Sequence, residues 1–239
     1  MAIKTQSIDY ACNNVQMRGH LAFDDSIAGK RPGVMICHEW WGLNDYIRGR
    51  ASQVAALGYA VFALDMYGNG KTAASADEAG KLMNALFSNP DAQGRVQAAF
   101  DVLKSQSMVD ANKIAAMGYC MGGSMALHVA RGGMPLRGAA CFHGSLKPEQ
   151  PAKPGSIKAH LLVCHGADDP MVGWDQVTAF KDEMREARAD YQIHIYGGAQ
   201  HAFTNPNADK AGVKGLKYDA IADRRSWSAL EKFFQEIFS

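Results

Sequence analysis

Short apolar runs alternate with longer segments of helical period along the chain. Most of the later runs are almost entirely apolar, as expected of parallel strands that are covered on both faces. The segments between them place apolar residues three or four positions apart, which is typical of amphipathic helices. The predicted strands are Lys4–Ile8, Val15–Ala22, Gly33–Cys37, Tyr59–Leu64, Lys113–Gly118, Gly138–Phe142, His160–His165 and Tyr191–Tyr196. The predicted helices are Tyr46–Leu57, Ser75–Phe87, Pro90–Ser105, Met121–Arg131, Trp174–Ala187 and Tyr218–Phe238.

This alternation predicts the architecture of the chain. Strand, helix and strand repeat in turn, which favours a doubly wound, mostly parallel α/β sheet with right-handed crossovers and helices on both faces. The first two strands have no helix between them and predict an antiparallel hairpin. No linker, internal repeat or low-complexity stretch interrupts the pattern, so residues 1–239 are expected to form a single domain.

Composition and charge narrow the class of partner. The 239 residues are 47% hydrophobic and 21% charged, which provides enough apolar sequence for a large core. The formal net charge is +1 at pH 7, so no global charge draws the chain to nucleic acid or to an anionic membrane. A small molecule is therefore the expected partner.

Targeting signals and cysteine spacing bear on compartment and cofactors. The N-terminal stretch MAIKTQSIDYACNN lacks the apolar core of a signal peptide, and no apolar run reaches the roughly 18 residues that span a bilayer. The five cysteines form no Cys-x-x-Cys pair, and HEWWG lacks the second histidine of a zinc-binding helix. We therefore expect a cytoplasmic protein with no disulfide framework, no metal and no cofactor.

The stretch MGYCMGG, residues 117–123, is the first candidate for chemistry. Cys120 follows a predicted strand, precedes a predicted helix and is flanked by Gly118 and Gly122. This spacing is that of a nucleophile elbow with sulfur in place of oxygen. The glycines let the helix pass close to the strand, and a helix N-terminus stabilises a thiolate. The alternative is a tight turn around a small buried thiol, as expected for the cysteines inside the strands.

Two candidate partners follow Cys120 in the chain order nucleophile, acid, histidine. The motif GADDPMV follows one later strand and offers Asp168 and Asp169, and His201 follows the next. All lie at the sheet edge where Cys120 is expected. His201 would take the thiol proton and return it to the leaving group, while an aspartate holds its imidazole. Asp169 is preferred because Asp168 could form the turn that an Asp-Asp-Pro run needs.

The HEWWG stretch after the third predicted strand supplies a second signal. At this place the backbone N–H of Trp40, together with that of Met121, would form an oxyanion hole. Glu39 precedes Trp40, and a carboxylate near a thiol opposes thiolate formation by charge repulsion. In the alternative, Glu39 faces water while Trp40 and Trp41 belong to the core. The residues by themselves leave both interpretations open.

Four motifs together resemble a known family. HEWWGLN, GYCMGG, GADDPMV and GGAQHAF, in this order and at these separations, are similar to those of the dienelactone hydrolases, cysteine members of the α/β-hydrolase fold. The resemblance runs from the first hairpin to the last helix. It implies a triad of Cys120, Asp169 and His201 that cleaves small esters or lactones. It also implies that Glu39 hydrogen-bonds the resting thiol and moves when substrate binds.

Two positions depart from the pattern of that family. Dienelactone hydrolases bind the lactone carboxylate with an arginine four residues after the catalytic histidine, where this chain has Asn205. A second arginine of the family corresponds to Asn69, with Lys71 nearby as a substitute cation. Asparagine lacks the charged bidentate clamp of a guanidinium, so dienelactone itself is disfavoured as the substrate.

Aromatic residues close to these positions in sequence are candidates for the wall of an apolar substrate pocket, and ordinary core packing would explain them equally well. They are Trp40, Trp41, Tyr67, Tyr119 and Phe203.

Two other classes of function compete with hydrolysis. A thiol at a helix N-terminus could sense oxidants, and the fold could bind a small ligand without turnover. No resolving cysteine lies near Cys120 in sequence, and all three triad candidates are present. The sequence therefore favours a hydrolase that forms a thioester at Cys120.

Overall fold

The structure, a computed structural model, describes residues 2–239 and divides into two compact units. The first unit runs to Ala116 and the second from Met117 to Ser239. All the predicted strands and helices are present, with ends that differ by a few residues. The largest shifts are of four residues: β5 (Val109–Tyr119) begins four residues before the predicted start at Lys113, and the first strand ends at Cys12 rather than at Ile8.

The first unit opens with the antiparallel hairpin that the sequence predicts. β1 and β2 pair along their whole length around Asn13, whose positive φ of 51° suits a two-residue hairpin turn. β2 also pairs antiparallel with β4, and β4 pairs in parallel with β3. These strands are β1 (Ile3–Cys12), β2 (Val15–Asp24), β3 (Arg31–Cys37) and β4 (Ala60–Ala63).

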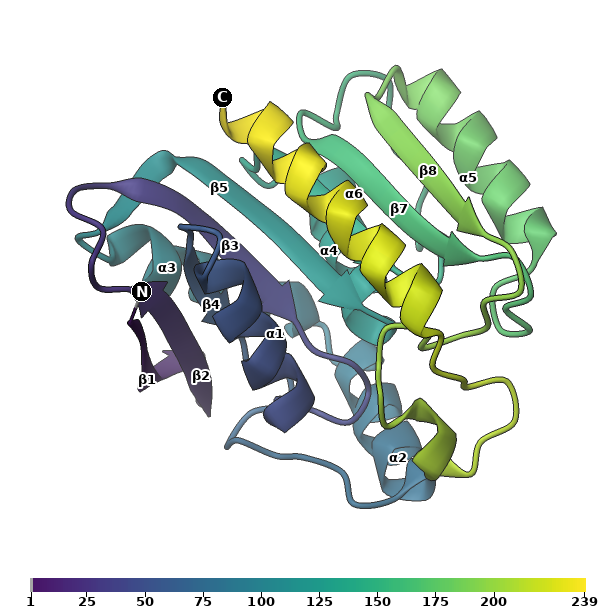
Figure 1. Cartoon of the computed structure of the whole chain (residues 1–239), viewed down its shortest axis with the longest axis horizontal. Coiled ribbons are helices and arrows are strands. Elements are labelled where there is room, and N and C mark those ends of the chain that lie inside the picture. The colour runs from purple at the N-terminus through teal and green to yellow at the C-terminus, as the bar shows by residue number, and fades with distance from the viewer. Residues whose placement is uncertain (1) are drawn as a thin grey trace. The chain divides into compact units, whose positions relative to one another are not determined.

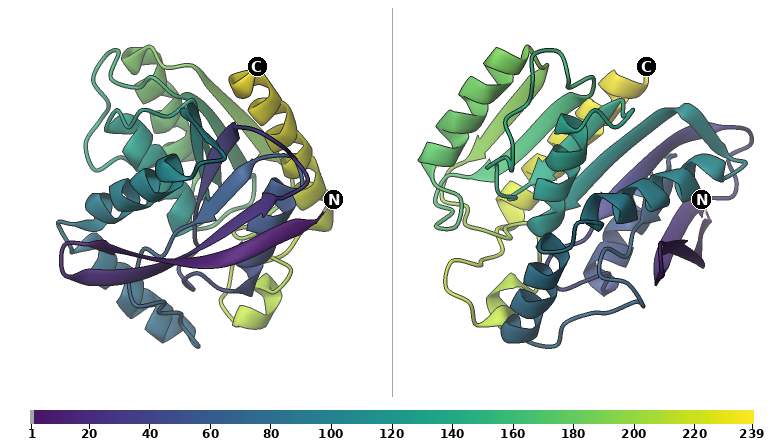
Figure 2. Two further views of the ribbon diagram at one scale, coloured as in Figure 1. Left: turned by 90° about the vertical axis from the view of Figure 1, so that its left-hand side faces the viewer. Right: turned by 180° about the vertical axis from the view of Figure 1, so that it is seen from behind.

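Helices cover both faces of the strands in the first unit. They are α1 (Asp45–Ala55), α2 (Ala76–Phe87) and α3 (Ala92–Ser105). α1 packs on β2 and β4, whereas α3 packs on β1 and β3, and the views show the two helices on opposite sides (Figures 1 and 2). Asn44 and Ser75 cap α1 and α2 by accepting hydrogen bonds from backbone N–H groups, which is the role these residue types favour.

The second unit holds three parallel strands in the order β6, β7, β8. α6 lies on one face of these strands, and α4 and α5 lie on the other (Figures 1 and 2). A short 3-10 helix, η1, was not predicted. The elements are α4 (Met121–Arg131), β6 (Gly138–Phe142), β7 (His160–Gly166), α5 (Trp174–Ala187), β8 (Tyr191–Tyr196), η1 (Ala208–Ala211) and α6 (Ala220–Phe238).

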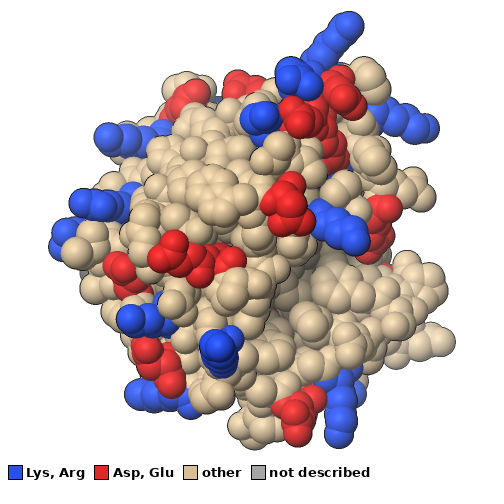
Figure 3. Space-filling model, turned by 90° about the vertical axis from the view of Figure 1, so that its right-hand side faces the viewer, with Lys and Arg blue, Asp and Glu red and all other residues tan. Residues whose placement is uncertain are grey.

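Burial explains the sequence pattern of these strands. Every residue of β4 and β6 is buried, so neither strand shows the polar alternation of a sheet with one face in water. α6 buries Leu230, Phe233, Phe234 and Ile237, which recur at the three- and four-residue spacing of an amphipathic helix. No helix within residues 2–239 is long and apolar enough to cross a membrane. Positive and negative side chains are interspersed over the face shown in Figure 3.

The ends of four strands place the chemistry of the second unit. β5 ends at the residue before Cys120, and β6 at the residue before His143. Asp169 follows β7 by three residues, and His201 follows β8 by five. Because the carboxyl ends of parallel strands meet at one edge of a sheet, these side chains converge there.

Candidate active site

Cys120 occupies a strained turn between β5 and α4. Its backbone has φ 53° and ψ −122°, a conformation that residues other than glycine rarely adopt. A Cβ on Gly118 would lie 2.2 Å from the carbonyl carbon and oxygen of Gly122, so the approach of strand and helix requires the glycine. Strain of this kind persists where the surrounding structure holds it, and it is common at functional sites.

The backbone of Cys120 is held from two sides. Its N–H donates to the Phe142 carbonyl at 2.9 Å and to Nδ1 of His143 at 3.1 Å. Its carbonyl accepts from the N–H groups of Gly123 and Ser124 in the first turn of α4. The residue is half-buried. The thiol is therefore carried on a fixed backbone at the N-terminus of a helix.

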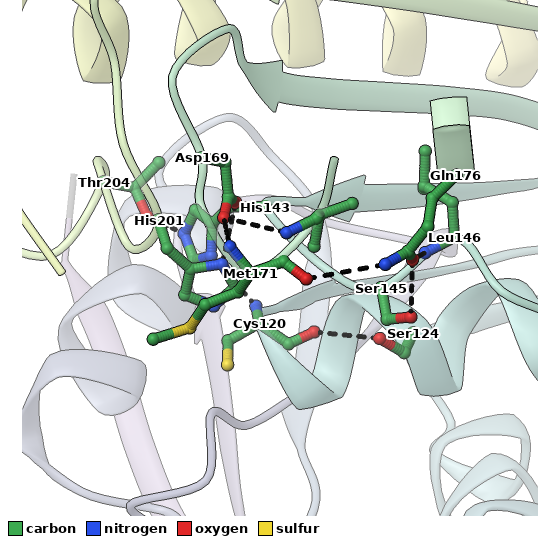
Figure 4. A network of polar contacts seen from close by, with 11 residues as sticks. Cys120, Ser124, His143, Ser145, Leu146, Asp169, Met171, Gln176, His201 and Thr204 are labelled. Atoms are coloured by element: carbon green, nitrogen blue, oxygen red, sulfur yellow. Dashed lines mark hydrogen bonds and ion pairs between the residues drawn. The ribbon is translucent and has the colours of Figure 1, made fainter. Parts of the chain in front are cut away.

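Asp169 and His201 form a buried pair. Nδ1 of His201 lies 2.8 Å from Oδ2 of Asp169, whose side chain is fully buried. The other carboxylate oxygen accepts from the N–H groups of Met171 and Val172 at 2.8 and 3.1 Å. Because the carboxylate only accepts, Nδ1 of His201 carries a proton and Nε2 is the basic nitrogen. Figure 4 shows this cluster beside Cys120.

The structure separates the two aspartates that the sequence leaves as alternatives. Asp168 is exposed, whereas Asp169 holds His201. The sequence analysis expected Asp168 to form the turn of the Asp-Asp-Pro run. In the structure Asp169 forms it, by accepting hydrogen bonds from the backbone N–H groups of Met171 and Val172. That part of the sequence argument was wrong, because a carboxylate has two oxygens and serves both purposes at once.

The charge state of His201 depends on its two acidic neighbours. Burial lowers the pKa of the His201 imidazole, but the negative charge of the Cys120 thiolate and the hydrogen bond to Asp169 outweigh burial and raise it to about 10. Nε2 is buried, and Cys120 raises the pKa of the ring mainly through its charge and to a lesser degree through hydrogen bonding. The imidazolium form of His201 is therefore favoured whenever Cys120 carries a negative charge.

His143 is a member of this cluster that the sequence analysis missed. It is buried, and its ring lies 5.3 Å from the His201 ring and 5.2 Å from the Phe203 ring, edge to face in both cases. Nε2 lies 2.8 Å from Oγ1 of Thr204. The available signal was the CFHG sequence, a histidine directly after an apolar strand. It was overlooked because His143 precedes Asp169 in the chain and does not fit the triad order.

Glu39 and its neighbours in the first unit form a second ordered loop. Glu39 is only 1% exposed, so the interpretation in which it faces water is wrong. Nδ1 of His38 lies 2.6 Å from the Glu39 carbonyl, and Nε2 of His38 accepts from the Met66 N–H at 3.1 Å. The Tyr67 hydroxyl donates to the Trp40 carbonyl at 2.8 Å. The peptide groups on either side of Trp40 are thus each held by a hydrogen bond to a side chain.

The positions that replace the family's arginines differ in their surroundings. Asn205 is buried, and its side-chain oxygen accepts from the N–H of Asn207 at 2.9 Å. Asn69 is exposed and has a positive φ of 56°, and Lys71 is exposed as well. Asn205 therefore supports its own loop.

The aromatic candidates for a pocket wall fall into two groups. Tyr119 and Phe203 are fully buried in the second unit, where Phe203 packs between the rings of His143 and Tyr196. In the first unit, the half-buried rings of Trp40 and Trp41 meet edge to face at 5.0 Å. The third residue of this unit, Tyr67, is buried.

Three of the other four cysteines differ from Cys120 in exposure, whereas Cys12 is half-buried like Cys120. Cys37, Cys141 and Cys164 are fully buried in their strands, as expected, and burial raises the pKa of each thiol to about 12. Such thiols stay protonated and inert at neutral pH. Over residues 2–239, no group of three or more histidine, cysteine or acidic side chains has the geometry to hold a metal ion.

Comparison with protein families identifies the relatives of this chain. The family model described as the dienelactone hydrolase family matches residues 17–238. The chain belongs to the dienelactone hydrolase family. It is therefore a hydrolase of the ester or lactone type with an α/β-hydrolase fold, as the sequence motifs predict.

Individual proteins are similar to this chain along nearly their whole length. The crystal structure of a dienelactone hydrolase-like promiscuous phosphotriesterase from metagenomic libraries has a TM-score of 0.96 and 39% identity, covering 100% of both chains. Protein usf of Aquifex pyrophilus is 28% identical over 98% of this chain and 99% of its own length. A Bradyrhizobium protein named "Probable 2-oxo-3-(5-oxofuran-2-ylidene)propanoate lactonase" is 25% identical over 95% of this chain and 94% of its own.

Proposed function

We propose that this dienelactone hydrolase family member cleaves small uncharged esters and lactones through a thioester at Cys120. One observation carries the proposal. The half-buried thiol stands on a strained elbow beside His201, whose Nδ1 is tied to the buried Asp169 at 2.8 Å. This supplies a nucleophile, a base and a group that orients the base.

Acyl transfer at this site proceeds in two halves. The Cys120 thiolate attacks the carbonyl carbon, and the His201 imidazolium gives its Nε2 proton to the departing alkoxide. Neutral His201 then takes a proton from water, and the hydroxide attacks the thioester. Collapse of that intermediate releases the carboxylic acid and restores the thiolate and the imidazolium. Thiolate is a good leaving group, so esters and lactones suit the site better than amides.

Two further roles belong to the proposal. The N–H groups of Trp40 and Met121 are the donors to the oxyanion, which develops only after attack. Support for Trp40 comes from the bonds of His38 and Tyr67 to the carbonyls on either side of its N–H. Glu39 is proposed as the gate that the family motif implies: a carboxylate beside the thiol would oppose thiolate formation until substrate displaces it.

The substrate is proposed to lack an essential carboxylate. Asn205 is occupied with its own loop, and Asn69 offers an amide in place of a guanidinium. Neither can form a charged bidentate pair with an anionic lactone. A neutral ester does not need such a pair. Dienelactone carries a carboxylate that would have no charged partner at these positions, so it should bind more weakly.

A second substrate class follows from the relative that is 39% identical over the whole chain and is named as a promiscuous phosphotriesterase. The same thiolate could attack the phosphorus of an aryl dialkyl phosphate and expel the aryl oxide. Water that His201 activates would then hydrolyse the phosphorus–sulfur bond formed at Cys120.

Intact-protein mass spectrometry tests the proposal directly. The protein is mixed with a panel of small esters, lactones including dienelactone, and an aryl dialkyl phosphate, and is quenched within the first turnovers. We expect a mass increase equal to the acyl group with neutral esters, and none with Cys120→Ala. Turnover of no compound in the panel would reject the proposal and favour ligand binding. Formation of a Cys120 sulfenic acid with peroxide, without ester turnover, would favour a redox role instead.

A further inference from the structure

His143 contacts the nucleophile's backbone, yet the reaction steps above do not use it. Its Nδ1 lies 3.1 Å from the Cys120 nitrogen, and its Nε2 lies 2.8 Å from the Thr204 hydroxyl, three residues after His201. One side chain therefore connects the residue that carries the thiol to the loop that carries the base. Figure 4 shows His143 at the centre of this network.

The hydrogen bonds determine which nitrogen of His143 carries the proton. A backbone N–H can only donate, so Nδ1 of His143 accepts from Cys120 and is unprotonated. In the neutral ring the proton is then on Nε2, which donates to Oγ1 of Thr204. Because Nδ1 is already occupied, His143 is not available to take the thiol proton. Its function must differ from that of His201.

The backbone at His143 is shaped to keep these contacts. His143 has a positive φ of 41°, a region that favours glycine and asparagine. At Gly144, a Cβ would lie 2.7 Å from both the Cys120 carbonyl oxygen and the Ser124 nitrogen, so the chain passes directly against the elbow. A strained residue next to a glycine that tolerates no side chain indicates a segment built around Cys120.

We propose that His143 is a positioning residue for the nucleophile: a neutral imidazole, protonated on Nε2, that holds the Cys120 amide and keeps the thiol in register with His201. Thr204 fixes the tautomer from the other side of the ring, as a hydrogen bond to one nitrogen determines the state of the other. This inference rests on the proposed function, because it assigns His143 to the same thioester chemistry.

Two substitutions of His143 test its two hydrogen bonds separately, because each keeps one of them and removes the other. In His143→Asn, the side-chain oxygen replaces Nδ1 as an acceptor for the Cys120 N–H, and asparagine tolerates the positive φ. In His143→Gln, the amide reaches the place of Nε2 and can still donate to Thr204, but the Cys120 N–H keeps only the Phe142 carbonyl as an acceptor. Thr204→Val removes the second contact alone. His160→Asn, at an exposed histidine paired with Asp190, is the matched control.

Steady-state hydrolysis of p-nitrophenyl acetate and alkylation of the thiol by iodoacetamide are the readouts. For His143→Gln we expect kcat to fall by about 10- to 100-fold with KM within about twofold, because a small displacement of reacting groups costs this much. Alkylation should slow in parallel. His143→Asn should recover most of kcat, Thr204→Val should show a smaller loss than His143→Gln, and His160→Asn should match the wild type.

The outcomes distinguish this inference from the proposed function. Without ester turnover by the wild type, the proposed function itself fails. If the wild type is active and His143→Gln keeps full kcat, the positioning role is wrong. If His143→Asn is as slow as His143→Gln while both unfold at the wild-type temperature, ring volume rather than the acceptor matters, and the inference is overturned.

Discussion

Two buried histidines, one in each unit, have pKa values that are shifted in opposite directions. His38 follows β3 and His201 follows β8, and both are less than 5% exposed. Burial lowers the pKa of His38 to about 4. Burial also opposes the charged form of His201, yet its pKa is raised to about 10. The same desolvation therefore accompanies a neutral ring in one unit and a charged ring in the other.

The difference lies in the partners of the two rings. Both nitrogens of His38 are satisfied by backbone groups, the Glu39 carbonyl and the Met66 N–H, which demand a neutral ring with one proton. His201 has a carboxylate on one nitrogen and a thiolate near the other. Backbone partners make an imidazole a structural connector, whereas acidic side chains make it a proton carrier. His143, with a backbone N–H and a hydroxyl as partners, belongs with His38.

The largest effect is expected from His201→Gln. This variant removes the base and the imidazolium, so kcat for p-nitrophenyl acetate should fall by at least about 1,000-fold. His38→Phe should cost far less turnover, because its ring transfers no proton in the mechanism. Rates of both variants, with circular dichroism as a check of folding, test the contrast. Equal losses in two folded variants would show that the division into connector and proton carrier is wrong.

Asp169→Asn should bring His201 closer to the state of His38. The amide removes a negative charge from Nδ1, so the pKa of His201 should fall, and kcat should drop by about 100-fold or more. The pH profile of kcat/KM reports the change, since the limb assigned to loss of the imidazolium should move to lower pH. An unchanged profile would mean that Cys120 alone sets the charge of His201.

His38 should make the protein less stable in mild acid. Its pKa of about 4 in the folded state lies below the ordinary value of 6.5, so the unfolded chain binds the proton first. The contribution of this group to stability is constant above pH 6.5 and is lost as the pH falls from 6.5 to 4, by about 3 kcal/mol. His201 has the opposite sign: its stabilising charge is present below pH 6.5 and is lost as the pH rises toward 10.

Urea unfolding of His38→Phe compares these pH dependences. At pH 7 the variant should be less stable by about 1 to 3 kcal/mol, because the Met66 N–H loses its acceptor. Toward pH 4 the gap should narrow, since phenylalanine has no proton to bind. A constant gap over this range would exclude His38 as the titrating group.

The sequence was sufficient for the elements that depend on local pattern. β6, α4, α5 and β8 have the predicted ends, because each has a continuous apolar run or a clear helical period. The elbow was predictable as well, since the need for glycine at Gly118 arises from the backbone of Gly122, four residues further along the chain. Strand β5 starts earlier than expected because Val109–Asn112 is partly polar, and pairing rather than pattern extends it.

Contacts between distant segments were beyond the reach of sequence pattern. The choice of Asp169 over Asp168 depends on which carboxylate meets His201, 32 residues further along the chain. The place of His143 depends on Cys120 and Thr204, 23 and 61 residues away. No local rule gives an imidazole these partners. The chain order of a triad predicts the role of His201. It predicts nothing for His143, whose ring lies against that of His201.

The smallest effect is expected at Glu39, which tests whether the first unit controls the charge contrast. In Glu39→Gln, the carboxylate that opposes the thiolate becomes a neutral amide of the same shape, so iodoacetamide should label Cys120 several-fold faster at neutral pH. Mass spectrometry of peptides after labelling separates Cys120 from the half-buried Cys12, and Cys37, Cys141 and Cys164 are protonated and buried. An unchanged rate would remove Glu39 as the gate and leave the state of the thiol to His201 and the helix alone.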